Sequence, residues 1–402
     1  MANPKMRFTR PDGGAFPNWS IRRMGTLTQE YKKRNKSKLP LDIYSVNNEV
    51  GFLPQSEQFE DAGYLNDTDT SIYMIVPPNY FAYNPARINV GSIGYQNVGH
   101  DVQVSSLYEV FKTTDELDDS FLWHWFHTPI FNKAVKRLQE GGVRQYYYYE
   151  KLKETSISLP CLEEQRIVAG FLSNVDEVIA KCSQEVANFE TQKKAVMKKI
   201  FSRAVRFARP DGSDFPEWED VRFGDVFTEI VRKTSDTETY PLFSLTIEDG
   251  VTAKTERYER SYLVKKAEDN YKIVPPNAFV YNPMNLRFGA LAPSHEDKEV
   301  CVSQYYNVFA LNDETTLGFW ESYLVTDEML KFYFSIATGS LVEKLRVHYS
   351  NFVNIVKPIP CVEEQRLIAN FLSDFDEAIA AAKRELELWK ELKKGLLQQM
   401  FV

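Results

Sequence analysis

Apolar residues recur at alternating intervals of four and three positions along two stretches of the chain, one covering residues 162–201 and the other beginning at residue 362. Each stretch holds this spacing over ten successive seam positions, nine of which are apolar or small. An apolar period of about 3.5 residues kept this long is typical of a coiled coil. The pattern predicts two long helices that pair with each other in antiparallel orientation. The alternative is a pair of ordinary amphipathic core helices.

The one polar seam position is a lysine at the same place in both stretches. The seam residues that we single out are Leu172, Val175, Ile179, Val186, Phe189 and Lys193 in the first stretch, and Leu372, Phe375, Ile379, Leu386, Trp389 and Lys393 in the second. A single polar seam residue fixes the register in many coiled coils. We therefore predict that Lys193 and Lys393 set the register.

The similarity extends beyond the helices, so the chain consists of two related halves. Of 22 aligned positions, 14 are identical between LPCLEEQRIVAGFLSNVDEVIA, which starts at residue 159, and IPCVEEQRLIANFLSDFDEAIA, which starts at residue 359. A long-period repeat decides the architecture of a chain. Two further pairs of segments match, namely RFTRPDGGAFPNW (7–19) with RFARPDGSDFPEW (206–218), and IVPPNYFAYNP (75–85) with IVPPNAFVYNP (273–283).

Between these motifs, short runs of β-branched and aromatic residues alternate with Pro, Asn and Gly, which is typical of short strands and turns. A helical segment follows in each half, at 120–140 and 318–345. The predicted fold class is α+β, with two pseudo-repeated globular α/β domains separated by two long helices that form an antiparallel coiled coil. We place the two globular domains at residues 1–158 and 206–358 and the two helical regions at 159–205 and 359–402.

The bulk composition is that of a soluble globular protein, with a net charge of −8. On its own this charge weakens a nucleic-acid hypothesis, although basic residues gathered locally would restore it. No apolar run approaches the roughly 18 residues of a membrane span, and the start of the chain lacks the apolar stretch of a signal peptide. We therefore expect a cytoplasmic protein with no membrane partner. The four cysteines show no CxxC spacing, so neither a zinc site nor a disulfide framework is indicated.

Several catalytic patterns were tested against the sequence. There is no Gly-Lys dipeptide, hence no Walker A loop. The two Val-Pro-Pro-Asn segments differ from the methyltransferase tetrad on both sides of the prolines, so we interpret them as structural turns. Asp12, Glu30 and Lys32 form a loose nuclease-like pattern, but the second half lacks the lysine. His124 and His127 have a spacing that would suit a metal, although decoration of a helix explains them more simply. No metal site is predicted.

Two variable domains, each followed by a long helix with P-C-x-E-E-Q-R and F-L-S-x-x-D-E motifs, resemble the specificity subunit of type I restriction-modification systems. The helix motif lies at Glu163–Glu177 and Glu363–Glu377, and the F-P-x-W turn lies at Phe16–Trp19 and Phe215–Trp218. The resemblance covers essentially the whole chain. It implies a non-catalytic, sequence-specific DNA-binding subunit, in which two target-recognition domains each read half of a bipartite site in double-stranded DNA.

The resemblance also implies partners. Two methylase subunits would dock on the helical regions, and two restriction subunits would supply translocation and cleavage. S-adenosylmethionine, ATP and Mg would then be bound by those subunits, and no cofactor by this chain. A coiled coil of fixed length would fix the spacing between the half-sites, because the DNA helix repeats about every 10.5 base pairs.

Candidate DNA contacts follow from basic and aromatic residues in the two halves. Lysine and arginine neutralise phosphates, and arginine also reads guanine edges. Arg87 and Arg287 follow the Tyr-Asn-Pro turns, and Arg144 and Arg346 stand beside aromatic residues, so we expect these two pairs to be equivalent between the halves. The candidates are Lys32, Lys33, Arg34, Lys36, Lys38, Arg87, Arg144 and Tyr146 in the first half, and Arg232, Lys233, Arg287, Arg346 and His348 in the second.

Two other functions remain open on sequence alone. A scaffold whose coiled coil joins two modules that do not bind DNA would show no salt-dependent DNA binding. A nuclease built on Asp12, Glu30 and Lys32 would cut DNA by itself in the presence of a metal ion. For the candidates that both halves share, an ion pair or turn bond within the domain is the alternative role.

Overall fold

The structure is a computed structural model that describes residues 3–47, 51–55, 69–139, 145–254, 271–341 and 344–402. It divides into two compact units: unit 1 comprises residues 1–183 and 384–402, and unit 2 comprises residues 184–383. Each unit thus contains one globular domain and half of each long helix. The division of the chain into four separate segments, at the boundaries given above, remains a prediction. Within the described residues, no helix is long and apolar enough to cross a membrane.

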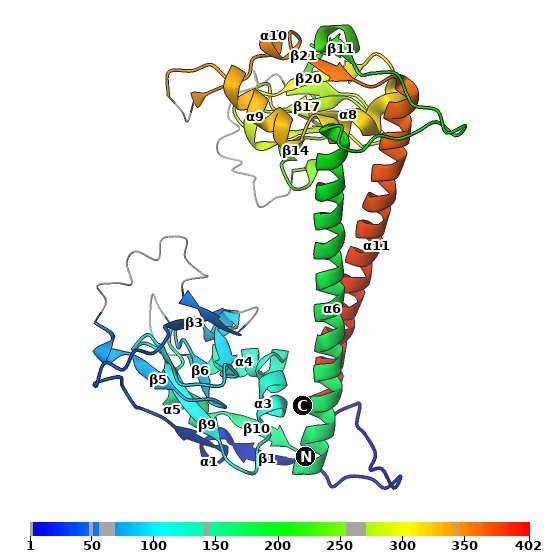
Figure 1. Cartoon of the computed structure of the whole chain (residues 1–402). Helices are drawn as coiled ribbons and strands as arrows, with labels where there is room; N and C mark the ends of the chain where they lie inside the picture. The colour runs from blue at the N-terminus through cyan, green and yellow to red at the C-terminus, as the bar shows by residue number, and fades with distance from the viewer. Residues whose placement is uncertain (1–2, 48–50, 56–68, 140–144, 255–270, 342–343) are drawn as a thin grey trace. The chain divides into compact units, whose positions relative to one another are not determined.

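Unit 1 is built on a four-stranded antiparallel sheet with strand order β2-β9-β6-β7 (Figure 1). Three two-stranded antiparallel pairs, β1-β10, β3-β4 and β5-β8, complete it. The strands are β1 Ser20–Arg23, β2 Thr28–Glu30, β3 Tyr44–Asn47, β4 Gly51–Pro54, β5 Met74–Val76, β6 Phe81–Tyr83, β7 Ile93–Tyr95, β8 Val102–Val104, β9 Glu109–Thr113 and β10 Ser156–Leu159. Its shorter helices are α1 Met24–Leu27, η2 Thr70–Ile72, η3 Ile88–Val90, α3 Asp119–Phe126, α4 Pro129–Leu138 and α5 Tyr149–Glu154.

Unit 2 repeats this topology, with a four-stranded sheet in the order β12-β20-β17-β18. Its remaining sheets are β11-β21, β14-β15 and β13-β16-β19. The strands are β11 Glu219–Arg222, β12 Phe227–Glu229, β13 Lys233–Thr234, β14 Phe243–Thr246, β15 Gly250–Ala253, β16 Tyr271–Val274, β17 Phe279–Tyr281, β18 Leu291–Pro293, β19 Val300–Val302, β20 Asn307–Leu311 and β21 Val356–Ile359. Its shorter helices are α7 Phe223–Val226, η5 Leu286–Phe288, η6 Glu314–Thr316, α8 Leu317–Tyr323, α9 Asp327–Ile336 and α10 Tyr349–Phe352. The predicted α+β fold with two pseudo-repeated domains is confirmed.

The helical segments predicted at 120–140 and 318–345 are each two helices rather than one. In unit 1, α3 ends at Phe126 and α4 begins at Pro129, with the Thr128 hydroxyl accepting a hydrogen bond from the Phe131 amide. Proline lacks the amide that a continuing helix needs, and it is favoured in the first turn of a new one. Thr326 caps α9 in the same way. Apolar residues keep a helical spacing on both sides of each break, so the sequence pattern predicted one continuous helix.

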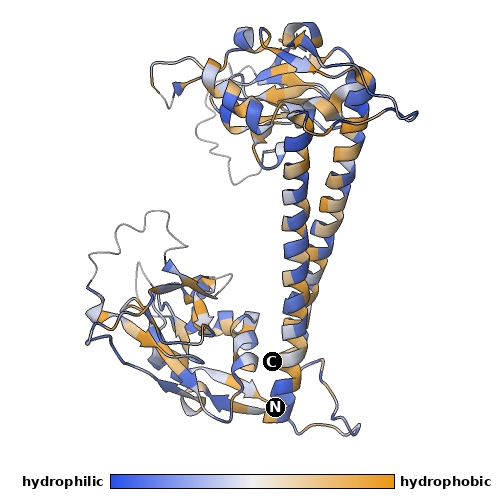
Figure 2. Cartoon of the chain, viewed as in Figure 1, coloured by the Kyte–Doolittle hydropathy of each residue, from blue (hydrophilic) through white to orange (hydrophobic). Residues whose placement is uncertain are grey.

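The two long helices are α6, Leu162–Phe201, and α11, Val362–Met400. Within each unit, half of α6 lies beside half of α11, and the two run antiparallel as predicted. In unit 1 the first half of α6 faces the second half of α11, and unit 2 holds the converse pairing. The seam residues are buried or half-buried, and most of the exposed positions are hydrophilic (Figure 2). Leu388 and Leu392 of α11 are also exposed.

The end of each long helix completes the core of a globular domain. In unit 1, Phe401 is buried against Trp19 and Phe121, with the Phe121 ring centroid 5.1 Å away. In unit 2, Phe201 packs against Phe319 and Tyr323 in the same manner. Each domain is therefore closed by a helix that the chain supplies from the opposite half of the repeat.

The repeated motifs form a matching brace in each unit. Arg7 donates two hydrogen bonds, from Nε at 2.9 Å and from Nη2 at 2.8 Å, to the fully buried carboxylate of Glu164. Arg206 and Glu364 form the same pair in unit 2. The Glu of each E-E-Q-R motif thus holds the segment that opens the domain, and the motifs that identify the repeat serve the framework.

Candidate nucleic-acid interface

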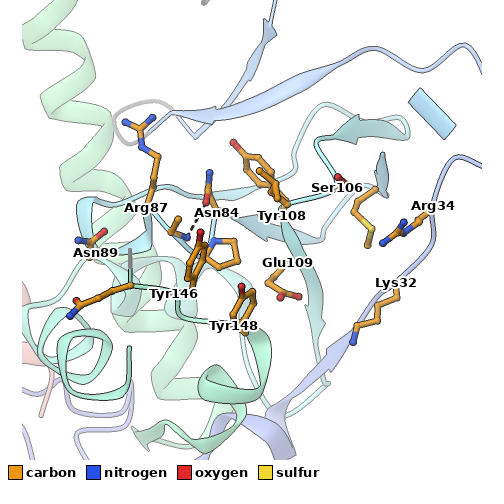
Figure 3. Close-up of a pocket in the computed structure, with 15 residues that line it drawn as sticks. Lys32, Arg34, Asn84, Arg87, Asn89, Ser106, Tyr108, Glu109, Tyr146 and Tyr148 are labelled. Atoms are coloured by element: carbon orange, nitrogen blue, oxygen red, sulfur yellow. Dashed lines mark hydrogen bonds between the residues drawn. The ribbon is translucent and has the colours of Figure 1, made fainter. Parts of the chain in front are cut away.

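Four of the predicted contact residues gather around one cavity of about 1010 Å³ in unit 1 (Figure 3). They are Lys32, Arg34, Arg87 and Tyr146, and they come from three separate segments of the chain. Asn89, Gln145, Tyr108 and Tyr148 are among the other residues of the lining. We refer to this cavity as the basic–aromatic pocket.

Arg87 is carried by a rigid turn. The Asn84 side chain accepts a hydrogen bond from the Ala86 amide at 3.0 Å, and the Pro85 carbonyl accepts one from the Tyr147 amide at 3.0 Å. The turn ends at Gly91, whose φ of 92° lies in the left-handed region that favours glycine. Arg87 itself is exposed at the head of η3 (Figure 3).

Tyr146 and Tyr148 form a stacked pair on the pocket rim. Their ring centroids lie 5.4 Å apart at an interplanar angle of 8°. Tyr147 between them points inward, where it is buried and hydrogen-bonds to Thr155. Burial raises the pKa of Tyr147 far above that of a free tyrosine, so it stays neutral. This alternation leaves two aromatic faces available to a planar ligand.

The basic segment that begins at Lys32 is shaped by Asn35, which sequence reasoning missed. Asn35 is buried and bonds to the Leu39 amide and carbonyl and to the Gln103 side chain, at 2.8, 2.9 and 3.0 Å. The sequence signal that could have indicated this role is the single asparagine within the basic run KKRNKSK. Lys33, Lys36 and Lys38 lie outside the pocket lining, and Lys38 pairs with Asp69 at 3.4 Å.

One carboxylate, that of Glu109, lines the pocket, and that of Glu30 lies beside Lys32 outside the lining. The Lys32 ammonium lies 2.6 Å from Glu30, and this hydrogen bond raises the pKa of Lys32. Burial, and then the neighbouring Glu30, raise the pKa of Glu109 in the lining. Lys32 is thus held in place while remaining largely exposed, so its charge stays accessible to a phosphate.

The candidates in unit 2 have different surroundings. Arg232 is paired with Glu299 through both oxygens of the carboxylate, whereas Lys233 is exposed. Arg346 and His348 are also exposed. The Arg287 guanidinium lies 4.6 Å from the ring centroid of Phe288 and 5.7 Å from that of Phe334, and both rings are 53% exposed.

The structure contradicts the predicted equivalence of Arg87 and Arg287. The left-handed glycines Gly91 and Gly289 end η3 and η5, and they align the two turns position by position. Arg87 then matches Asn285, because both stand immediately before the first residue of the turn. Arg287 matches Asn89. The arginine and the asparagine have exchanged places between the halves. Pairing Arg87 with Arg287 by residue type is wrong by two positions.

The second predicted pair is also displaced. The amides of Tyr147 and Val347 bond to the carbonyls of Pro85 and Pro283, so Tyr147 matches Val347. Arg346 therefore matches Tyr146, and His348 matches Tyr148. Arg144 lies outside the described residues. In the sequence the two arginines, Arg144 and Arg346, look equivalent. The backbone hydrogen bonds instead place Arg346 at the position of Tyr146.

The Val-Pro-Pro-Asn segments are turns in both units, with Asn79 and Asn277 at positive φ of 67° and 61°. Their amides bond to the carbonyls of Gln96 and Ser294. This geometry agrees with the structural role predicted for them.

The remaining catalytic candidates are taken up by structural contacts. Asp12 accepts a hydrogen bond from Gly14 within its turn, while Glu30 pairs with Lys32. His124 is buried and bonds to Ser173, whereas His127 bonds to the Trp123 carbonyl. Within the described residues, no three His, Cys, Asp or Glu side chains gather in a way that would hold a metal ion.

Known proteins resemble the chain over its whole length. The family model for the type I restriction modification DNA specificity domain matches residues 47–188 and again residues 216–388. The type I restriction enzyme MjaVIII specificity subunit of Methanocaldococcus jannaschii is 23% identical over 411 aligned positions, covering 94% of this chain and 91% of that protein. A relative from the same organism, named for the type I restriction enzyme MjaX, is 25% identical over 426 positions, with coverage of 97% and 94%.

Two solved structures share the fold. The type I restriction-modification S subunit from M. genitalium superposes with a TM-score of 0.56 at 13% identity, covering 100% of this chain and 99% of the other. A structure from work on complex assembly and conformational transition of the type I R-M system superposes with a TM-score of 0.59 at 16% identity, covering 96% and 97%.

Proposed function

Because the chain belongs to the type I restriction-modification DNA specificity family, we propose that it selects the bipartite DNA sequence on which a type I complex acts. Each globular domain reads one half of the site. The observation that carries this proposal is the pattern of likeness between the halves. Their turns and braces repeat, whereas the side chains presented by those turns differ.

The differing side chains are of the kinds that read bases. Arginine contacts guanine through two hydrogen bonds, and asparagine contacts adenine in the same way. Arg87 and Asn89 in unit 1 correspond to Asn285 and Arg287 in unit 2, so the same two base-reading types occur in exchanged order. A pair of readers exchanged on one framework suits two half-sites of different sequence.

Phosphate contacts would come from cations near these readers. Lys32 and Arg34 border the basic–aromatic pocket, and Lys33 and Arg34 occupy the positions of Arg232 and Lys233 in unit 2. Such contacts position a protein on the duplex without reading its sequence. Cations present in both halves therefore suit backbone contact better than base contact.

The chain acts in this proposal without catalytic chemistry of its own. Two methylase subunits and two restriction subunits assemble on it, and they bring S-adenosylmethionine, ATP and Mg. The names of the relatives as specificity subunits support this division of labour. The outward faces of α6 and α11, which are mainly hydrophilic but expose Leu388 and Leu392 on α11, would receive the methylase subunits.

Exchanging the two readers in one unit tests the proposal. The variant Arg87→Asn with Asn89→Arg keeps net charge and composition, and the matched variant Asn285→Arg with Arg287→Asn makes the reverse exchange in unit 2. Each is co-expressed with the methylase subunit, and methylated adenines are mapped across the host genome. We expect each exchange to alter only one half of the recognised motif.

The outcome separates the proposal from its alternatives. If both variants methylate the wild-type motif, these turns do not read the bases. A scaffold whose modules do not bind DNA would leave the map unchanged even when the chain is absent.

A further inference from the structure

A second basic surface in unit 1 lies where α4 meets the end of α11. Five lysines line a cavity of about 550 Å³ there, namely Lys133 and Lys136 from α4 and Lys390, Lys393 and Lys394 from α11. The lining contains no carboxylate. We call this cavity the lysine groove. In a chain of net charge −8, five cations around one cavity are a local concentration that needs an explanation.

Most of this charge is not neutralised within the part of the chain that the structure describes. Lys393 pairs with Asp176, and Lys390 lies 2.7 Å from Glu387 on its own helix. Lys133, Lys136 and Lys394 are exposed and make no ion pair with a described residue. Counting only partners among the described residues, the groove therefore presents three ammonium groups without an ion pair to an incoming anion.

The fold does not require two of these lysines, because only Lys136 and Lys390 are replaced at the equivalent positions of unit 2. The offset between the helix caps of α4 and α9 places Phe334 at the position of Lys136, and the helix repeat places Glu190 at the position of Lys390. The corresponding cavity of unit 2 is lined by lysines together with carboxylates, among them Glu190, Asp249 and Asp376. The same architecture thus supports either charge pattern, and among the described residues the lining of the unit 1 groove contains no acid.

Helix α4 links the lysine groove to the turn that borders the basic–aromatic pocket. The η3 turn that carries Arg87 and Asn89 packs against α4, and α4 supplies Lys133 and Lys136 to the groove. A polyanion held at the pocket rim therefore meets the lysines next if it extends along α4. Lysine is a compact point charge, suited to phosphate oxygens rather than to base edges.

We infer that the lysine groove binds the phosphate backbone of the duplex beside the half-site read by unit 1, independently of base sequence. This inference rests on the proposed function, because it takes the pocket rim as the place where the half-site lies. It assigns the groove a role in affinity and none in specificity.

The test compares two variants with identical chemistry. Lys133→Gln with Lys394→Gln removes two unpaired cations of the groove, and Lys331→Gln with Lys194→Gln makes the same changes at the equivalent positions of unit 2. The full chain, in complex with its methylase subunit, is titrated against a duplex that contains the methylated motif and a duplex of scrambled sequence, each from 0.05 to 0.3 M salt. Co-purification of the methylase subunit is recorded for every variant.

We expect the groove variant to lower the slope of log affinity against log salt by about two, since each phosphate contact contributes roughly 0.9. Its affinity at 0.1 M salt should fall by roughly 60-fold, and by the same factor for both duplexes. The unit 2 variant should leave slope and affinity unchanged. An unchanged slope in the groove variant, an equal loss in the unit 2 variant, or a loss confined to the motif duplex would overturn the inference. So would loss of the methylase subunit with the slope retained, because the groove would then be a protein interface.

The wild-type protein reports separately on the proposed function. If it binds the two duplexes equally, the chain does not select sequence, whatever the groove does. If it discriminates between them while the groove variant keeps its salt slope, the proposed function stands and the lysine inference fails.

Discussion

The Lys193 ammonium lies 2.5 Å from the Asp376 carboxylate, across the seam from α6 to α11 in unit 2. The repeat-equivalent residues Lys393 and Asp176 form the reciprocal pair in unit 1. Each lysine interrupts an otherwise apolar seam, and each finds a carboxylate on the facing helix. A polar seam residue with one matched partner penalises shifted alignments, because a shift leaves the half-buried charge unpaired.

Reversing the charge of Lys193 should destabilise the protein by bringing two carboxylates together. For Lys193→Glu we expect the free energy of unfolding to fall by about 1 kcal/mol, the range of partly exposed ion pairs. The double variant Lys193→Glu with Asp376→Lys should recover most of this loss. Urea denaturation followed by circular dichroism measures both, with Lys181→Glu on the exposed face of α6 as the control. A double variant no more stable than the single one would refute the pairing.

The brace between Arg7 and Glu164 should matter more than the seam pairs. Arg7→Ala leaves a fully buried carboxylate without its partner, and we expect a loss of about 2–4 kcal/mol. Arg7→Lys should restore little, because an ammonium cannot make both hydrogen bonds of the guanidinium. The midpoint of urea unfolding reports the change, and Arg206→Ala provides the repeat-equivalent test in unit 2. A midpoint within error of wild type for Arg7→Ala would contradict this account of the motif.

His124 should make the stability fall in mild acid. Burial is the main cause that lowers the pKa of His124, to about 4; the Asp176 carboxylate opposes it, and Lys393 lowers the pKa further. The unfolded chain therefore binds a proton more readily than the folded one, so the contribution is complete above pH 6.5 and is lost as the pH falls toward 4. At about 1.4 kcal/mol per pKa unit, the loss reaches about 3 kcal/mol at most.

Urea midpoints at pH 7.5, 6 and 5 measure this effect. The variant His124→Gln should flatten the decline, although not abolish it, because burial also lowers the pKa of His127. His100→Gln, at an exposed histidine, is the control and should leave the decline unchanged. Equal declines in wild type and His124→Gln would count against a buried neutral His124.

Phe401 should anchor the end of α11 to the first globular domain. Phe401→Ala removes a buried ring from the cluster with Trp19 and Phe121, and such truncations cost about 3–5 kcal/mol. Hydrogen exchange should then show faster exchange in the last turns of α11 and in α3. The matched variant Phe201→Ala should loosen α8 in unit 2 instead. Protection unchanged in α3 would mean that the helix end is not required by the domain.

The framework was predictable because the chain repeats it. The heptad seam, the E-E-Q-R motif and the Tyr-Asn-Pro turn recur at a nearly constant interval, and each has a local physical signature. The brace from Arg7 to Glu164 lay within these motifs, but the pairing itself joins residues 157 positions apart and needed the structure. The break between α3 and α4 was visible as Thr128-Pro129, yet the apolar spacing outweighed it.

The sequence predicted which types of residue form the candidate interface, but not which positions of the two halves are equivalent. Lys32, Arg34, Arg87 and Tyr146 do border one pocket, whereas the presumed equivalence of Arg87 with Arg287 was wrong. Matching identical residues fails where the two halves exchange side chains on a shared backbone. The lysine groove escaped the sequence analysis because the lysines of α4 lie more than 250 residues before those of α11, and α11 as a whole has more acidic than basic residues.

The central claim is that this chain determines which DNA sequence is methylated. The most direct measurement is a map of methylated adenines in the source genome, taken with the gene present, deleted and restored. The account predicts that one bipartite motif disappears on deletion and returns on restoration. A map that is identical in all three strains, with the partner methylase shown to be expressed, would contradict it.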